Sequence, residues 1–311
     1  MGVWSSRRSA GSRPTSRRGR LVAVAAALAV AGASLTGCTV EAGQALILDG
    51  QSFTEQSIQH DSSDFVAANS TTAVPVTVTS SVNRAQITFR VRHALIAKAL
   101  AAKGITEAQI AQATAAVKAQ GGTSNVAAQL QLPSSDEADA LHDAIALDAL
   151  VKALPAAGTQ VQNVRVTAES VPATSRDEAV ALRSKFLADP ATMTAAVAVA
   201  KNSTTPGPNG NFDLVTASGA AEAGLFLPTV GTILIVAQSS GYLVVRTTGR
   251  TVDAATLTQD SFSQLTSLTQ LFDVGALLLV PYENSTKISV NPRYGVWDPA
   301  SVQVVPGNDG L

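Results

Sequence analysis

Cysteine, aromatic residues and charge are all scarce in this chain. A single cysteine among 311 residues excludes a framework of internal disulfides and any zinc site built from cysteines. Aromatic residues make up 4% and charged residues 14%, whereas 46% are hydrophobic, so we expect a folded protein with an aliphatic core. The three histidines, His60, His93 and His142, are far apart in sequence, without ligand spacing. We therefore expect no metal site and no cofactor.

The positive charge is concentrated at the N-terminus. Six arginines precede Gly37, and no acidic residue lies among them. Without these six, 16 basic residues face 23 acidic ones, which leaves a net charge of −7. This balance argues against nucleic-acid binding and against electrostatic attachment to anionic lipid.

Residues 1–37 have the layout of a cleavable export signal. The arginine-rich segment leads into Leu21–Gly37, which is uncharged, rich in alanine and too short for a spanning helix of roughly 20 strongly apolar residues. The segment ends in Leu35-Thr36-Gly37-Cys38, which resembles the lipobox of bacterial lipoproteins. The resemblance implies lipidation of Cys38 and a place on the extracytoplasmic face of the cell membrane. An uncleaved anchor with an incidental cysteine is the alternative, and both the Sec and the twin-arginine export routes stay open.

Residues 83–160 are expected to be helical, after a strand and an irregular segment in residues 38–82. Steps of four between Ile87, Val91 and Leu95 predict one buried face of a helix over Asn83–Lys103. Three further helices are expected over about 106–120, 125–131 and 134–155, because each begins with capping residues or ends at glycine or proline. The strand is placed at 45–49, and residues 62–81 are taken as irregular.

Strand patterns begin near residue 161. Alternating valines predict a strand over Val161–Val171, followed by helices over 175–188 and 190–201. A strand over Gly241–Arg246 is expected to close at Gly249, and a helix to follow over about 256–274. The acidic pairs at 136–137 and 177–178 begin helices, where they complement the helix dipole rather than catalyse a reaction. The fold class expected is α+β.

The order of these elements resembles the SurA/PrsA family of extracytoplasmic folding factors. Lys103-Gly104-Ile105-Thr106 is similar to a corner of the family's N-terminal chaperone domain. Residues 161–250 resemble a parvulin module, through the loop 203–214, the pair Gly231 and Ile233, and Gly241-Tyr242-Leu243. The resemblance implies a helical SurA-type domain at 83–160 and a parvulin-like domain at 161–250. A C-terminal helix and tail at 251–311 would pack on the helical domain.

Parvulins isomerise prolyl bonds with two histidines and an Asp or Cys. The corresponding positions here are Leu243, Ala168 (within one residue) and Thr205. No histidine follows His142, so neither histidine can be supplied from this part of the chain. We expect a parvulin-like fold without catalytic residues.

The resemblance implies a membrane-anchored, chaperone-like protein that binds unfolded or newly exported polypeptides in an apolar cradle between its two domains. The candidate client-binding residues are Phe212, Leu225, Phe226 and Tyr242. Tyr294 and Trp297 are expected to pack the tail onto the body. One alternative is a prolyl isomerase with an altered site. The other is an assembly or scaffold lipoprotein with one dedicated partner. A compact apolar patch would favour this alternative, whereas a large apolar cradle would favour the chaperone.

Overall fold

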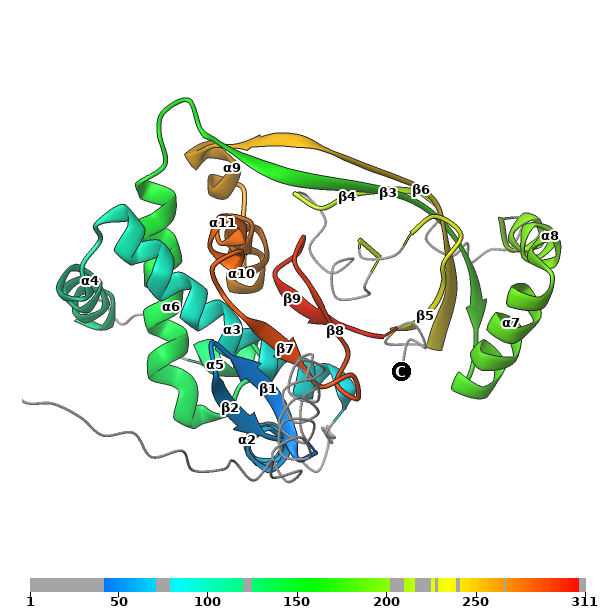
Figure 1. Ribbon diagram of the computed structural model, residues 1–311, viewed down its shortest axis with the longest axis horizontal. Coiled ribbons are helices and arrows are strands. Elements are labelled where there is room, and N and C mark those ends of the chain that lie inside the picture. The colour runs from blue at the N-terminus through cyan, green and yellow to red at the C-terminus, as the bar shows by residue number, and fades with distance from the viewer. Residues whose placement is uncertain are drawn as a thin grey trace, which may run out of the picture. The chain divides into compact units, whose positions relative to one another are not determined.

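The computed structural model describes residues 42–70, 79–119, 125–201, 210–215, 225–226, 229–238, 241–265 and 267–307. These residues form an α+β protein, as expected, in which helices pack with three antiparallel sheets (Figure 1). Within these ranges, no helix is both long and apolar enough to cross a membrane. Cys38 and Thr205 lie outside the described residues.

A small sheet joins the two ends of the described chain. It has the order β2-β1-β7, built from β1 (Gln44–Leu48), β2 (Gln51–Thr54) and β7 (Ile288–Val290). Helix α2 (Glu55–Asn69) follows, so the expectation of an irregular segment from residue 62 is wrong for 62–69. The hydroxyl of Ser62 donates to Asn83 Oδ1 at 2.7 Å, and this contact with the next helix is invisible to local periodicity.

Helix α3 (Ser80–Lys103) is the centre of the helical part. It begins three residues before the predicted start, because the Thr79 hydroxyl accepts a hydrogen bond from the Val82 amide. It ends at Gly104, which adopts the left-handed conformation with φ +67°. Ile87, Val91 and Leu95 have no exposed surface, which confirms the predicted buried face.

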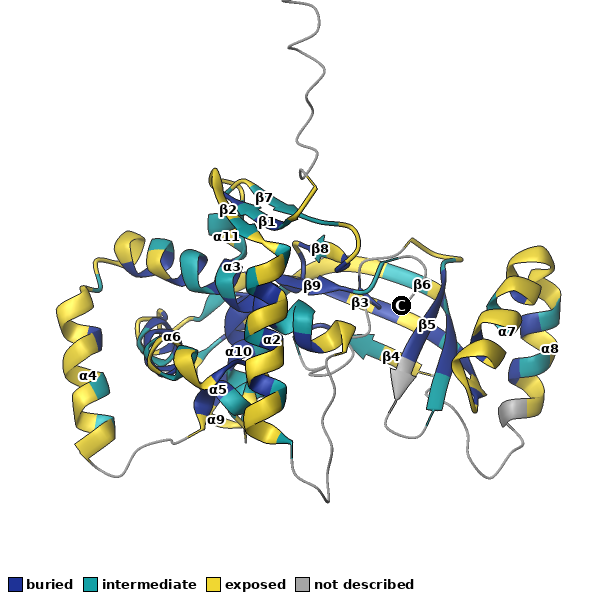
Figure 2. Cartoon of the chain, turned by 90° about the horizontal axis from the view of Figure 1, so that it is seen from below, coloured by how far each residue is buried: buried dark blue, intermediate teal, exposed yellow. Residues whose placement is uncertain are grey.

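Four further helical segments complete this part. They are α4 (Glu107–Ala119), α5 (Val126–Gln129), the 3₁₀ turn η1 (Ser134–Asp136) and α6 (Glu137–Lys152). Helix α4 lies mostly exposed, with Ile110 as its buried residue (Figure 2). The Glu137 carboxylate accepts hydrogen bonds from the amides of Val126 and Ala127. The prediction that Glu137 only complements the dipole of its own helix is therefore incomplete, because the Glu137 side chain also caps the N-terminus of α5.

A four-stranded sheet with the order β4-β3-β6-β5 forms the second part. Its strands are β3 (Thr159–Ala173), β4 (Gly210–Asp213), β5 (Ile233–Gln238) and β6 (Gly241–Leu257). Helices α7 (Arg176–Ala188) and α8 (Pro190–Lys201) cover one face, through Phe186 and Met193. β3, α7, α8 and β6 follow one another in the predicted order, whereas β4, within the predicted loop 203–214, and β5 are strands that the sequence pattern does not predict.

Strand β6 does not close at Gly249 as predicted. It runs on to Leu257 because β3 pairs with it over its whole length, from Ala173 with Tyr242 to Thr159 with Leu257 (Figure 1). The register shifts by one residue between Thr167 and Ala168, which pair with Gly249 and Thr247, so Thr248 is the extra residue of a bulge in β6. The single helix expected over 256–274 is also wrong, since α9 (Gln259–Ser263) and α10 (Leu268–Ala276) are separate.

The C-terminal tail packs on the helical part. It comprises α11 (Val280–Glu283), β8 (Val296–Asp298) and β9 (Gln303–Val305). The Val304 amide donates to Thr88 Oγ1 of α3 at 2.9 Å. Tyr294 is buried in the helical core and Trp297 packs against it, which confirms the packing role expected of both. The Trp297 indole donates to Glu283 Oε1 at 2.9 Å.

Burial at this junction raises the pKa of Glu283 to about 7, and the hydrogen bond from Trp297 only partly opposes it. The folded protein therefore binds a proton that the unfolded chain releases at about pH 4.5. The stability linked to this group is complete below about pH 4.5 and is lost as the pH rises through 7.

The variant Glu283→Gln should raise the free energy of unfolding at pH 8 and leave it nearly unchanged at pH 4.5. Glutamine stays neutral, and its amide oxygen still accepts from Trp297. After allowance for solvent screening we expect a gain of about 1 kcal/mol at pH 8, or roughly 2–4 °C in Tm. Thermal unfolding of both proteins at the two pH values measures this. An equal difference at both values would show that ionisation of Glu283 is not the cause.

Candidate functional site

The four-stranded sheet carries two of the three positions where the parvulin resemblance places polar catalytic groups. Ala168 on β3 and Leu243 on β6 are 3% and 7% exposed and belong to the same hydrophobic core. Leu243 pairs with Pro172, whereas Ala168 pairs with Thr247. The two positions thus lie four residues apart along the strands, or roughly 13 Å. They share a core but are not cross-strand neighbours, and neither side chain can exchange a proton.

The four predicted client-binding residues do not form one surface. Leu225 and Phe226 are buried in the same core as Leu243 and expose almost no surface in this structure. Phe212 is half-buried against that core, while Tyr242 packs against the core beneath α7 and α8. Adjacent residues of a strand point to opposite faces, which separates Tyr242 from Leu243.

Large exposed hydrophobic side chains are few and scattered in the described chain. Three of them lie on α7 and α8, namely Val180, Leu187 and Val199. The other three lie on separate segments, namely Val230, Val252 and Val296. The described surface therefore carries isolated exposed apolar side chains, whereas the resemblance implies a large cradle.

A cleft of about 140 Å³ lies between α3, α5, α10 and β9. Phe89, Leu130 and Phe272 give it apolar walls. The buried Arg92 side chain also lines it and donates through Nε to the Val302 carbonyl at 2.8 Å. The tail thus forms one wall of the cleft, which sequence periodicity could not predict.

Polar groups in this cleft keep unused hydrogen-bonding capacity. Arg92 donates to Asp273 Oδ1 at 3.4 Å, whereas Asp273 Oδ2 and Gln303 Nε2 have no hydrogen-bond partner among the described residues. Burial raises the pKa of Asp273, and the charge of Arg92 opposes this. The cleft therefore combines an acceptor, a donor and apolar walls, which are the groups that a segment of extended polypeptide can use.

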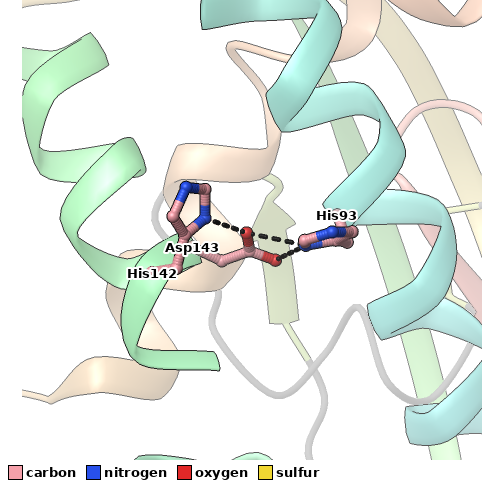
Figure 3. Close-up of side chains that lie close together, drawn as sticks. All are labelled: His93, His142 and Asp143. Atoms are coloured by element: carbon pink, nitrogen blue, oxygen red, sulfur yellow. Dashed lines mark hydrogen bonds and ion pairs between the residues drawn. The ribbon is translucent and has the colours of Figure 1, made fainter. Parts of the chain in front are cut away.

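Two of the three histidines meet elsewhere in the helical part. His93 on α3 and His142 on α6 both contact Asp143, and Figure 3 shows the carboxylate between the two rings. His93 Nδ1 lies 2.9 and 3.0 Å from the two carboxylate oxygens, and His142 Nδ1 lies 3.1 Å from Oδ1. On its far side, His142 Nε2 lies 2.9 Å from Glu107 Oε2 of α4.

The three side chains of this cluster differ in burial, and the pKa values of both histidines are raised. The Asp143 side chain is 0% exposed, while those of His93 and His142 are 45% and 26% exposed. Hydrogen bonding to Asp143 raises the pKa of His93, and it raises the pKa of His142 to about 9, where Glu107 adds to the effect. Partial burial opposes both shifts. His142 is therefore protonated at neutral pH.

Sequence spacing missed this cluster because its members come from different helices. His93 and Asp143 are 50 residues apart. A usable signal was present, since each lies three or four residues from buried members of its own helix, namely Phe89 and Ile96 for His93, and Ala140 and Leu147 for Asp143. Polar residues at the edge of two faces that pack together can meet. His60 stays apart, exposed on α2 beside Asp64.

No protein-family model and no curated protein matches the chain. Two solved structures show a distant similarity. One is the peptidylprolyl isomerase PrsA from Bacillus anthracis, with a TM-score of 0.24 and 14% identity, over 63% of this chain and 94% of that one. The other is the foldase protein PrsA from Lactococcus lactis, with a TM-score of 0.28 and 13% identity, over 83% of this chain and 97% of that one. Such scores leave function to be argued from the residues of this chain.

Proposed function

We propose that this protein is a lipid-anchored folding factor on the extracytoplasmic face of the membrane, which binds unfolded or newly exported polypeptides without isomerising prolyl bonds. The observation that carries the proposal is the burial of Leu243 in an apolar core, at the position where the resemblance to parvulins expects an imidazole. No histidine lies anywhere in residues 143–311, so no neighbouring residue in this part of the chain replaces it.

The helical cleft is our candidate for the client site. Its acceptor at Asp273 and donor at Gln303 match the main-chain groups that every polypeptide carries, and Phe89 and Phe272 suit an apolar side chain. Such a site binds without a fixed sequence motif. Its volume of about 140 Å³ is below the roughly 300 Å³ of a small ligand pocket, which favours a short stretch of chain over an enclosed ligand.

A second candidate function is an assembly lipoprotein with one dedicated partner. The few exposed apolar side chains on α7 and α8, Val180, Leu187 and Val199, favour it, because a general chaperone benefits from a larger apolar surface. Affinity capture from a membrane extract separates the two functions. Many unrelated exported proteins on the bait support a folding factor, whereas one partner in fixed ratio supports the assembly role.

Filling the cleft should remove the proposed chaperone activity. Ala85 lines the cleft on α3, so Ala85→Trp would occupy the space that a client side chain uses. The wild-type chain should slow aggregation of an unfolded protein, measured by light scattering, and the variant should lose most of this effect. Ala101→Trp, on the exposed side of the same helix, is the matched control and should retain it. Equal activity of the two variants would place the client site elsewhere.

The wild-type chain should add little to the rate of prolyl isomerisation. In an NMR exchange assay on a prolyl peptide, relaxation should stay near the roughly 10–100 s of the uncatalysed reaction. Leu243→His should not create activity, because Ala168 and Thr205 supply no partner for a new imidazole. Acceleration by the wild-type chain comparable to that of parvulins would establish the altered-site isomerase instead.

A further inference from the structure

The cluster around Asp143 has the composition and spacing of a metal centre. Among the described residues, His93, His142 and Asp143 form a group in which one donor atom from each side chain lies within 4.8 Å of the others. Two imidazole nitrogens and one carboxylate oxygen are a ligand set that first-row transition metals favour. We propose that these three side chains bind a divalent transition-metal ion of the zinc class between α3 and α6.

The nitrogen–oxygen distances in the cluster are close to those of a metal site, and the three donor atoms all lie within 4.8 Å of one another. Zinc bonds to nitrogen and oxygen ligands of about 2.0–2.2 Å place tetrahedral donors roughly 3.3–3.6 Å apart. The nitrogen–oxygen distances are now 2.9–3.1 Å, so they must open by a few tenths of an ångström. The half-exposed His93 ring can move by this amount, since solvent borders it on one side.

Surrounding groups orient the ligands and supply negative charge. Glu107 holds His142 Nε2 at 2.9 Å, which leaves Nδ1 directed at Asp143 and available to a metal. A carboxylate behind a ligating histidine is the usual support of such a ligand. Asp139 also acts on His93 through its charge. Three carboxylates therefore surround two imidazoles, and a divalent cation suits that balance better than an anion does.

The site is reachable from solvent. Three protein ligands leave a fourth position of a tetrahedral ion for water, and the exposed parts of His93 and His142 lie on the open side, while Asp143 closes the inner side. A bound ion would join α3 to α6 and stabilise the folded protein by mass action. This inference does not depend on the proposed folding function.

Calorimetric titration of the purified full chain with zinc sulfate, after treatment with a chelator, tests the proposal. We use pH 8, where the ion has to displace the proton that His142 still carries and competes with fewer protons than at neutral pH. The wild-type chain should bind one ion and show a higher Tm with zinc. His60→Ala is the matched control, since this exposed histidine lies on α2 outside the cluster, and it should behave as the wild type. His93→Ala and His142→Ala should lose the binding event.

Glu107→Gln provides a test that does not depend on changing a ligand. The Glu107 side chain is largely exposed on α4, so the fold should persist, and zinc affinity should fall roughly 10- to 100-fold because the outer carboxylate is lost. The proposal is overturned if the wild-type chain binds no stoichiometric zinc. It is equally overturned if His93→Ala and His142→Ala, confirmed as folded by circular dichroism, bind zinc as tightly as the wild type.

Discussion

Cys38→Ala should abolish the lipid anchor proposed for this protein. The proposed anchor is a diacylglycerol on the Cys38 thiol, and two acyl chains hold a protein on a bilayer where a single chain gives only marginal binding, with an association constant of about 10⁴ M⁻¹. Alanine has no thiol to accept the lipid. In detergent phase partitioning, the protein should therefore leave the detergent phase or accumulate as uncleaved precursor, which mass spectrometry identifies.

Thr39→Ala is the matched control for this experiment. It changes the next residue and leaves the thiol and the residues before it intact. The control should be lipidated and should stay in the detergent phase. Unchanged partitioning and unchanged mass of Cys38→Ala would contradict lipidation and would favour an uncleaved N-terminal anchor.

Leu95→Ala should destabilise the helical part by about 2–5 kcal/mol. Leu95 is fully buried on α3, in the core that also holds residues of α6, α10 and the tail. Truncation removes apolar burial and leaves a cavity that close-packed neighbours cannot fill completely. Urea unfolding followed by circular dichroism should show a lower midpoint with an unchanged slope.

Leu187→Ala makes the same substitution at a position that is largely exposed to solvent. Leu187 lies on α7 with 52% of its surface exposed. We expect a change within about 0.5 kcal/mol, as for other surface substitutions. Equal effects at Leu95 and Leu187 would contradict the assignment of the buried face of α3.

The client-binding candidates show that a resemblance to a family can assign a role to residues that their surroundings in the structure do not support. The resemblance predicts Leu225 and Phe226 as client-binding residues, yet both are buried in the core of the four-stranded sheet. The sequence around an apolar residue is the same whether the side chain binds a client or fills a core. Only the neighbours it meets in three dimensions distinguish the two roles.

Local chemistry by itself determined the α+β class and the positions of α4, α7 and α8. The Ser175 cap, the Gly104 stop and the step-of-four pattern of α3 all act within a few residues, so each is legible in the sequence. The absence of histidine after His142 is likewise a property of the sequence alone.

Tertiary structure alone decided the length of β6, the cleft and the histidine cluster. β6 continues past Gly249 because β3, some 80 residues earlier, supplies its hydrogen-bond partners, as in the pair Thr167 with Gly249. His93 meets Asp143 because α3 and α6 pack together. In each case the stabilising partner is remote in sequence, and its position depends on the packing of whole elements, which no local pattern encodes.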